Sequence, residues 1–306
     1  MISVNELNYG KYGKCVRISN DRIEIYVTVD FGPRIIRAGF VNGENFMKED
    51  TEFSMKTSLS GSKFNDDTFY NRGGHRFWIS PEAMPRTYYP DNEPVSYEKH
   101  GNTVVFTPPV QIANEFALSL EINMEENSDK RTVNHIAQNT GYWTKEFSPW
   151  AITVVAEEGI EIIPQNTTNT GLLSNRFIVF WPYTRIKDSR LDISDKYIRI
   201  TQSTDADCPL KLGLSQEMPW AAYFHHGCMF VKKYSPKKGA AYPDNGCTYE
   251  TYTNKKILEM ETLGELKSVL PGEKVSHMET WEFYENVEIP SDDSATDELA
   301  EKYKLN

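Results

Sequence analysis

The chain has 306 residues, with 33 basic against 44 acidic side chains and a formal net charge of -11 at pH 7. This acidic balance excludes nucleic acid and an anionic membrane surface as the main partner, because both repel negative charge. Aromatic residues make up 12% of the chain, which is more than a core requires. We therefore expect some of them on a binding surface.

The cysteines Cys15, Cys208, Cys228 and Cys247 form no CxxC pair and have no metal-ligand spacing. We expect free thiols and a reducing compartment, although an even number of cysteines also permits disulfides. The N-terminus lacks the apolar segment of a signal peptide, and no run of about 18 apolar residues occurs. The sequence thus predicts a cytoplasmic protein without a membrane span.

Alternating apolar and polar residues predict strands along most of the chain. Residues 22–29 and 35–41 form a first hairpin around Phe31-Gly32-Pro33. The further predicted strands are residues 103–111, 116–124, 130–138, 150–156, 176–183, 197–202, 210–214, 221–234 and 248–253.

Between the first hairpin and these strands, residues 42–70 predict a long loop with at most a short helix. The next segment, NRGGHRFWISPE at 71–82, places two glycines beside His75 and Arg76, which is typical of a loop that approaches a ligand. Residues 85–94 form a proline-bounded aromatic loop of the kind that covers a site.

Residues 257–284 predict two strands joined by a turn at Pro271-Gly272. The period of two places Leu258 and Met260 on one face and Glu259 and Glu261 on the other. Such an acidic face points either at water or at a polar ligand. Residues 291–304 predict a short C-terminal helix.

About a dozen strands with almost no helix predict an all-β fold, an antiparallel sandwich. No composition shift, linker or internal repeat divides the chain, so we expect a single domain over residues 1–306.

The sequence contains no GxGxxG after a strand, no GxxxxGK[ST], no GxSxG and no HExxH. It therefore gives no support for nucleotide binding, serine hydrolysis or zinc protease chemistry. His75 can transfer a proton, and Arg76 can bind two hydroxyls or a carboxylate. The alternative is a structural histidine beside an ion-paired arginine.

Flat aromatic rings stack on sugars, whereas Asp and Asn side chains bind sugar hydroxyls, so several residues at strand ends and in turns are candidates for sugar binding. For the tryptophans, core packing is the alternative. The candidates are Trp150, Trp181, Tyr242 and Asp244.

For the remaining histidines we expect structural roles rather than metal binding. His135 is expected to be a hydrogen-bonded histidine of the core or the surface, and His277 is expected to form a buried pair with Glu279. Strand alternation would point His225 and His226 to opposite faces, so that they could not share an ion. We expect no metal, with calcium held by residues distant in sequence as the open alternative.

Five segments together resemble the DUF4380 branch of the galactose mutarotase-like superfamily, over residues 22–284. These segments are GGHRFWISPE, SPWAITVV, LLSNRFIVFWPYT, YPDNGCTYE and METLGELKSVLPGEKVSHMETWEFY. The resemblance implies a β-supersandwich of two large antiparallel sheets with a sugar site on a concave face.

The resemblance also implies roles for particular residues. The METL motif ahead of Pro271-Gly272-Glu273 is similar to the LETQ motif of aldose mutarotases, which makes Glu261 the base. The GGH segment is similar to the loop that delivers a site histidine and arginine. The chain departs from the family at Trp150, which stands where mutarotases have their acid histidine.

The leading hypothesis is therefore a carbohydrate-binding, aldose 1-epimerase-like enzyme that needs no cofactor. Glu261 would be the base and His75 the acid, while Arg76 orients the sugar and Trp150 stacks on it. The other residues expected around the sugar are Glu82, Trp181, Tyr242 and Asp244.

Two alternatives stay open. One is a non-catalytic sugar-binding module that kept the groove and lost the acid. The other is an accessory role in polysaccharide cleavage, in which Glu82 would matter more. The sugar and the oligomeric state are unknown at this point.

Overall fold

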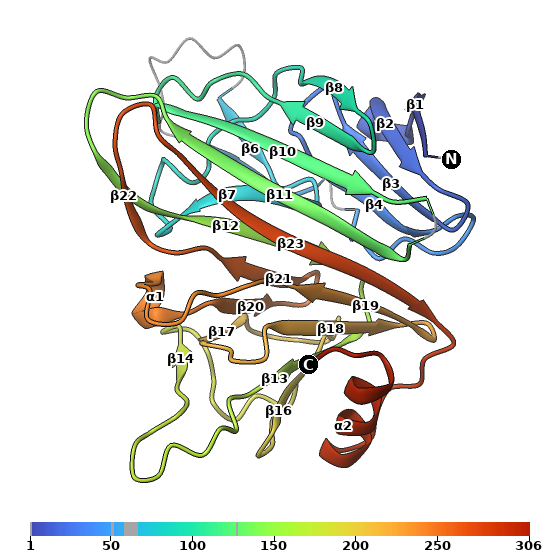
Figure 1. The fold of residues 1–306 in the computed structure, drawn as a ribbon, viewed down its shortest axis with the longest axis vertical. Coiled ribbons are helices and arrows are strands. Elements are labelled where there is room, and N and C mark those ends of the chain that lie inside the picture. The colour runs from blue at the N-terminus through green and yellow to red at the C-terminus, as the bar shows by residue number, and fades with distance from the viewer. Residues whose placement is uncertain (1, 50–51, 58–66, 127) are drawn as a thin grey trace.

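The computed structural model describes residues 2–49, 52–57, 67–126 and 128–306, and most of them form two large antiparallel sheets (Figure 1). In the first sheet β22 pairs only with β12, and the other strands follow one path. That path is β1 (Ser3–Asn8), β2 (Lys14–Ser19), β3 (Ile23–Thr28), β4 (Ile35–Phe40), β7 (Gly74–Ser80), β12 (Lys145–Val155), β21 (Leu258–Leu263), β20 (Tyr249–Thr253), β17 (Leu210–Leu214) and β14 (Ile178–Phe180), with β22 at Lys267–Val269.

The second sheet has ten strands. Their order is β15 (Leu191–Ile193), β16 (Tyr197–Thr201), β13 (Ile160–Pro164), β18 (Trp220–His225), β19 (Cys228–Lys233), β23 (Lys274–Glu285), β11 (Lys130–Asn139), β10 (Phe116–Met124), β9 (Thr103–Thr107) and β8 (Ser96–His100).

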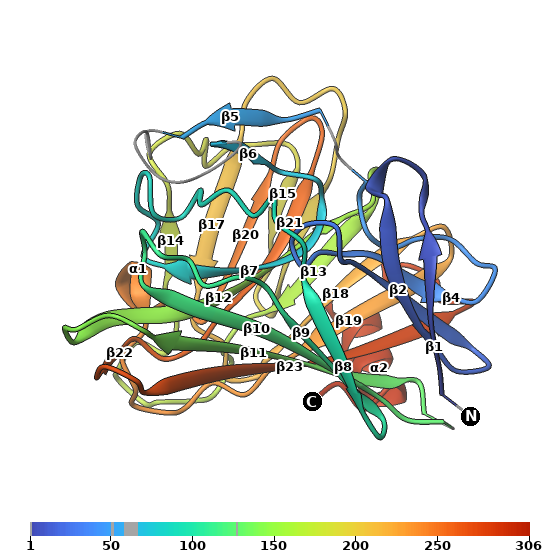
Figure 2. The ribbon, with the colours of Figure 1, turned by 90° about the horizontal axis from the view of Figure 1, so that it is seen from above.

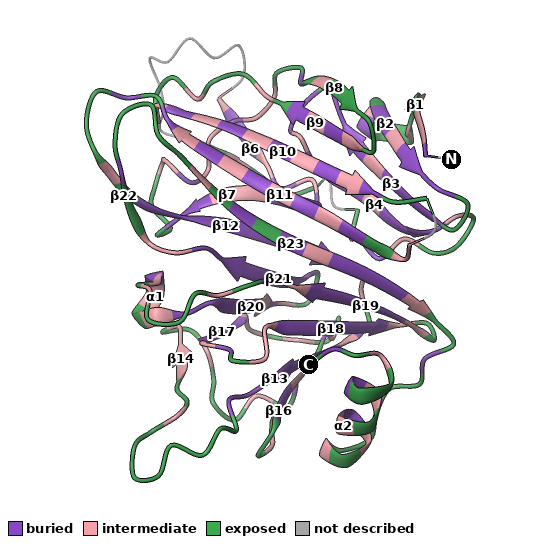
Figure 3. Cartoon of the chain, in the orientation of Figure 1, coloured by how far each residue is buried: buried purple, intermediate pink, exposed green. Residues whose placement is uncertain are grey.

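The core lies between the two sheets, and its residues come from alternate positions of the strands. In β10 every second residue from Phe116 to Met124 is buried, which is the period expected of a strand with one solvated face. β12 is buried at nearly every position because both of its faces are covered (Figure 3).

Small elements lie outside the two sheets. Figure 2 shows the hairpin of β5 (Ser54–Lys56) and β6 (Thr68–Tyr70) on the side of β7 and β12 that faces away from β10, β11 and β23. The helical pieces are η1 (Gly10–Tyr12), α1 (Pro243–Gly246) and α2 (Asp293–Lys302). In the part of the chain described here, no helix is long and apolar enough to cross a membrane.

The predicted all-β supersandwich of large antiparallel sheets is confirmed. The predicted C-terminal helix is also present as α2. Asp292 caps its N-terminus, because the Asp292 side chain accepts a hydrogen bond from the backbone N–H of Ala295. The four cysteines are free, as expected. The predicted strand at 221–234 is two strands, because His226 and Gly227 adopt positive φ angles of 47° and 72° and turn the chain.

Two loop predictions were wrong in part. Residues 74–80 form β7, and their glycines serve strand packing, since a Cβ on Gly74 would lie 2.3 Å from the carbonyl oxygen of Ile35 in β4. Within the long loop predicted at 42–70, the structure contains β5 and β6. Residues 50–51 and 58–66 of that loop lie outside the described residues.

The prediction that His225 and His226 point to opposite faces is also wrong. Their rings stack with centroids 3.8 Å apart. The alternation of a strand does not extend past His225, where β18 ends and His226 adopts its left-handed conformation.

Three buried histidines join the sheets through a hydrogen-bond chain with one direction. His135 Nδ1 lies 2.9 Å from the carbonyl oxygen of His277, which can only accept, so His135 carries its proton on Nδ1. Its Nε2 then accepts from His75 Nε2 at 2.7 Å, and His75 Nδ1 accepts from the Thr153 hydroxyl at 2.8 Å. Burial lowers the pKa of all three histidines, to about 3 for His277.

Beside this chain lies the ion pair of Lys232 and Glu279, 2.8 Å apart and buried on both sides. Burial alone would raise the pKa of Glu279, but Lys232 and the histidines hold it well below its usual range. Its oxygens also accept from Thr262 and Trp281, and Thr262 in turn accepts from His277 Nε2. His75, His135, Lys232 and Glu279 thus each have hydrogen-bond partners within this network.

We expect Lys232→Met to reduce the free energy of unfolding by about 3–5 kcal/mol, because it leaves Glu279 buried without its counter-ion. The double variant Lys232→Met/Glu279→Met should recover a large part of that loss. Urea unfolding measures both. Arg185→Met is the control, since the Arg185–Asp207 pair is mostly exposed, and it should leave stability almost unchanged. Equal losses of stability in Lys232→Met and Arg185→Met would contradict the role given to the buried ion pair.

Candidate functional site

A pocket of about 600 Å³ lies on the face of the first sheet that is turned away from the second sheet. Strands β7, β12, β17, β20 and β21 form its floor, and the β5–β6 hairpin contributes Phe53, Ser54 and Phe69 to its wall. This volume is within the range of about 300–1,000 Å³ that is usual for ligand pockets.

Aromatic side chains form much of the pocket surface. Trp78 packs edge-on against Trp150 and Tyr88, with ring centroids 5.5 and 5.2 Å apart. Tyr183 and Tyr252 make a second edge-on pair at 6.4 Å. Each ring in such a cluster is held by its neighbours, so the pocket offers fixed flat surfaces to a ligand.

Arg76 is a largely buried cation on the pocket wall, with only 3% of its surface exposed. Its Nη2 donates to Glu259 Oε1 at 2.9 Å, and its guanidinium lies 4.2 Å from the centroid of Trp78. Its Nε and Nη1 have no hydrogen-bond partner among the described residues. Because unpaired buried donors are costly, these atoms are suited to ligand oxygens.

Lys211 lies on the pocket floor between two carboxylates, 2.8 Å from Glu250 and 2.9 Å from Glu261. Burial opposes its charge, but the two carboxylates raise its pKa well above the usual value. Burial raises the pKa of both glutamates, to about 8 for Glu250. One ammonium is shared between two buried carboxylates, which favours the protonated form of one of them.

Four of the predicted sugar-binding residues lie on the pocket surface: Arg76, Glu82, Trp150 and Trp181. The predicted base, Glu261, lies one layer deeper and is fully buried. Its Oε2 accepts from Trp150 Nε1 at 2.8 Å and from Lys211. Glu261 therefore supports pocket residues and is not itself part of the described lining.

The predicted acid, His75, does not face the pocket. It is the neighbour of Arg76 on β7, so the two side chains point to opposite faces of the sheet, and His75 bonds His135 in the layer between the sheets. The structure therefore does not bring His75 and Glu261 together as the expected acid and base of one sugar site.

Two further predicted residues lie away from the described lining. Tyr242 precedes α1, and its hydroxyl accepts from the backbone N–H of Lys237 at 2.7 Å. Asp244 adopts a left-handed φ of 51° inside that turn. Both serve the turn chemistry that their sequence also predicts.

Several residues of the pocket lining are not among those predicted from the sequence: Trp78, Tyr88, Tyr183, Lys211, Tyr252 and Glu259. Some carried a usable signal. Glu259 alternates with Glu261, Tyr88 belongs to the aromatic loop at 85–94, and Lys211 is a charge within the apolar strand LKLGL. The partners of Lys211 come from two other strands, which no local pattern shows.

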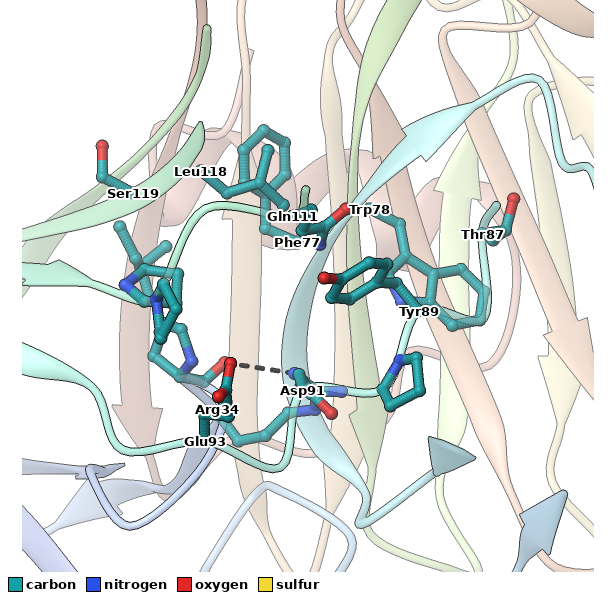
Figure 4. Close-up of a pocket in the computed structure, with 16 residues that line it drawn as sticks. Arg34, Phe77, Trp78, Thr87, Tyr89, Asp91, Glu93, Gln111, Leu118 and Ser119 are labelled. Carbon is teal, nitrogen blue, oxygen red and sulfur yellow. Dashed lines mark hydrogen bonds and ion pairs between the residues drawn. The ribbon is translucent and has the colours of Figure 1, made fainter. Parts of the chain in front are cut away.

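A second cavity, of about 60 Å³, lies beside the buried ion pair of Arg34 and Asp91 (Figure 4). Phe77, Tyr89 and Leu118 are among its lining residues. Its volume is far below the range of about 300 Å³ and more that is usual for ligand pockets. The 600 Å³ pocket is the candidate site, because it combines aromatic rings with the unpaired donors of Arg76.

The raised pKa of Glu250 has a consequence for stability. A group that is protonated when folded contributes stability that is present below its unfolded pKa and is lost as the pH rises through about 8. We expect the wild type to lose stability relative to Glu250→Gln between pH 5 and about 9. Thermal unfolding of both proteins measures this difference, and a constant difference across that range would contradict it.

No protein-family model matches the chain. No curated protein matches it in sequence either. The similarity lies in three-dimensional structure, where 89 solved chains match.

A proposed aldose 1-epimerase from Klebsiella pneumoniae subsp. pneumoniae MGH 78578 has a TM-score of 0.57 at 11% identity, over 99% of this chain and 87% of the other. A galactose mutarotase-like protein from Clostridium acetobutylicum has a TM-score of 0.54 at 13% identity. The match covers 93% of this chain and 99% of the other. A TPR-domain containing protein from Parabacteroides distasonis ATCC 8503 has 0.57 at 12%, over 92% of this chain. This chain spans about half of that protein, 48% of its length.

Sequence identities this low support similarity of fold alone. The chain has the galactose mutarotase-like fold.

Proposed function

We propose that the pocket binds a carbohydrate. The observation that carries this proposal is Arg76, a buried guanidinium with two unpaired donor atoms beside fixed aromatic rings. The names of the matched structures, aldose 1-epimerase and galactose mutarotase-like protein, add support. We also propose that the chain belongs to the DUF4380 branch of this superfamily.

A pyranose has apolar C–H faces and a rim of hydroxyls, and the pocket offers a partner for each. Trp181 and Tyr252 offer flat rings to the C–H faces, whereas Trp150 is almost fully buried and supports the pocket. Arg76 donates to sugar oxygens, and the carboxylates of Glu82 and Glu259 accept from hydroxyls. Charges of both signs line the pocket, so neutral sugars and sugar acids are the ligand classes to test first.

We expect Trp181→Ala to weaken sugar binding about 5- to 10-fold, because an aromatic stacking contact contributes about 1 kcal/mol. Titration of an aldose and sugar-acid panel, followed by NMR and calorimetry, measures the affinity. Trp143→Ala is the matched control, since Trp143 is 78% exposed and absent from the described lining. The proposal is overturned if no panel sugar binds, or if both variants bind a sugar as the wild type does.

A second candidate function is the interconversion of sugar anomers, favoured by the carboxylate of Glu259 at the pocket surface. In this mechanism Glu259 removes the proton from the anomeric hydroxyl while Lys211 donates a proton to the ring oxygen, and the C1–O5 bond opens. Glu250, whose pKa is raised to about 8 and which lies 2.8 Å from Lys211, then reprotonates Lys211. Rotation about C1–C2 and reclosure then return every proton.

This assignment gives Glu261 an indirect role through Lys211 and gives His75 none. The carboxylate of Glu259 takes the place of Glu261 because it lies at the surface of the pocket, whereas Glu261 lies beneath Trp150 and Lys211.

We expect Glu259→Gln to reduce anomer exchange by about 10²- to 10⁴-fold, the usual effect of losing a general base. Saturation-transfer NMR between the α and β signals measures the exchange. Glu82→Gln, which alters another carboxylate of the pocket, should retain most of the activity. If the wild type binds a sugar and exchanges its anomers no faster than buffer does, the protein is a non-catalytic binding module.

A further inference from the structure

A cluster of two imidazoles and a carboxylate lies outside the sugar pocket. Glu44 Oε2 lies 2.5 Å from His226 Nδ1 and 3.6 Å from His225 Nδ1. The three potential ligand atoms all lie within 4.8 Å of one another. Glu44 and His226 are more than half exposed, whereas the side chain of His225 is only 10% exposed.

The backbone brings these three side chains together from both sheets. Glu44 belongs to the loop after β4, and the histidines form the turn between β18 and β19. Asn45 fixes the loop: its Oδ1 accepts from the backbone N–H of Ala38 and Met47, and its Nδ2 donates to the carbonyl oxygen of Ile36.

The histidines lie at a two-residue hairpin turn, in which His225 pairs with Cys228. His226 occupies a left-handed φ of 47°, which most residues with a Cβ avoid, and that conformation stacks its ring on His225. Gly227 follows with a φ of 72°, and positive φ at both central residues is the usual geometry of such a turn.

We propose that Glu44, His225 and His226 together bind one divalent transition-metal ion of the zinc class. Two imidazole nitrogens and one carboxylate oxygen form a zinc ligand set, with the fourth position left for water. Zinc–ligand bonds of about 2.0–2.1 Å separate tetrahedral ligand atoms by roughly 3.3 Å. Small rotations of the exposed side chains of Glu44 and His226 reach that separation.

A second cluster of histidines and a carboxylate shows that these residue types alone do not make a metal site. His75, His135 and Glu279 meet the same distance condition, but they are fully buried. The ammonium of Lys232 already neutralises Glu279, and the histidines use their ring nitrogens within the network. The Glu44 cluster has no such cation among the contacts of the described residues and is open to solvent.

The ion would link the ends of interior strands of the two sheets. Its ligands come from the loop after β4 in the first sheet, and from the end of β18 and the following turn in the second. An ion that binds only the folded protein raises the melting temperature. Neither this site nor its effect depends on the sugar pocket.

The experiment is calorimetric titration of chelator-treated, tag-free protein with ZnCl₂, together with visible absorption of the Co²⁺ form. We expect one site per chain, a raised melting temperature with Zn²⁺, and an affinity reduced at least 10-fold in His226→Ala and in Glu44→Gln. His100→Ala is the matched control, since exposed His100 also lies 3.3 Å from a glutamate, Glu98, but has no second histidine.

Two outcomes overturn the proposal. One is Zn²⁺ binding by the wild type that is no tighter than binding by His226→Ala. The other is binding that survives Glu44→Gln but is lost in Cys228→Ser, whose thiol lies in the same small surface hollow. Glu44 and His226 are exposed, so both variants are expected to fold, and their melting temperatures without metal verify this.

Discussion

The two-residue period of the strands is the constraint on which the rest of the structure depends. In β7 it sends His75 into the layer between the sheets and Arg76 into the pocket. In β21 it sends Met260 into the core and Glu259 to the pocket surface. Each strand of the pocket floor therefore serves stability with one set of side chains and ligand binding with the other.

Both faces of this sheet contain charge that is balanced locally. Between the sheets, one ammonium and one carboxylate neutralise each other, and the histidines stay uncharged. On the pocket floor, one ammonium meets two carboxylates, and burial raises the pKa of both carboxyl groups. The first arrangement is closed, whereas the second can exchange a proton with a ligand, and this difference separates a structural network from a candidate catalytic one.

The sequence predicts the fold well because alternation is a local property: strands such as β10 and the pair of faces on β21 follow from it directly. It predicts the site in part. Trp150, Trp181, Glu82 and Arg76 line the pocket, whereas Lys211 and its two glutamates come from β17, β20 and β21, and only the sheet order brings them together. The glycines before His75 suggested a loop, but their close contact is with β4.

The fixed direction of the hydrogen bonds from Thr153 through His75 and His135 to the carbonyl oxygen of His277 has a consequence for divergence. A replacement at one position that reverses a donor and an acceptor leaves its neighbour unmatched. Substitutions along this line should therefore be accepted only as coordinated sets. Homologues would then form discrete classes, each with one set of residues along this line and one direction of its hydrogen bonds.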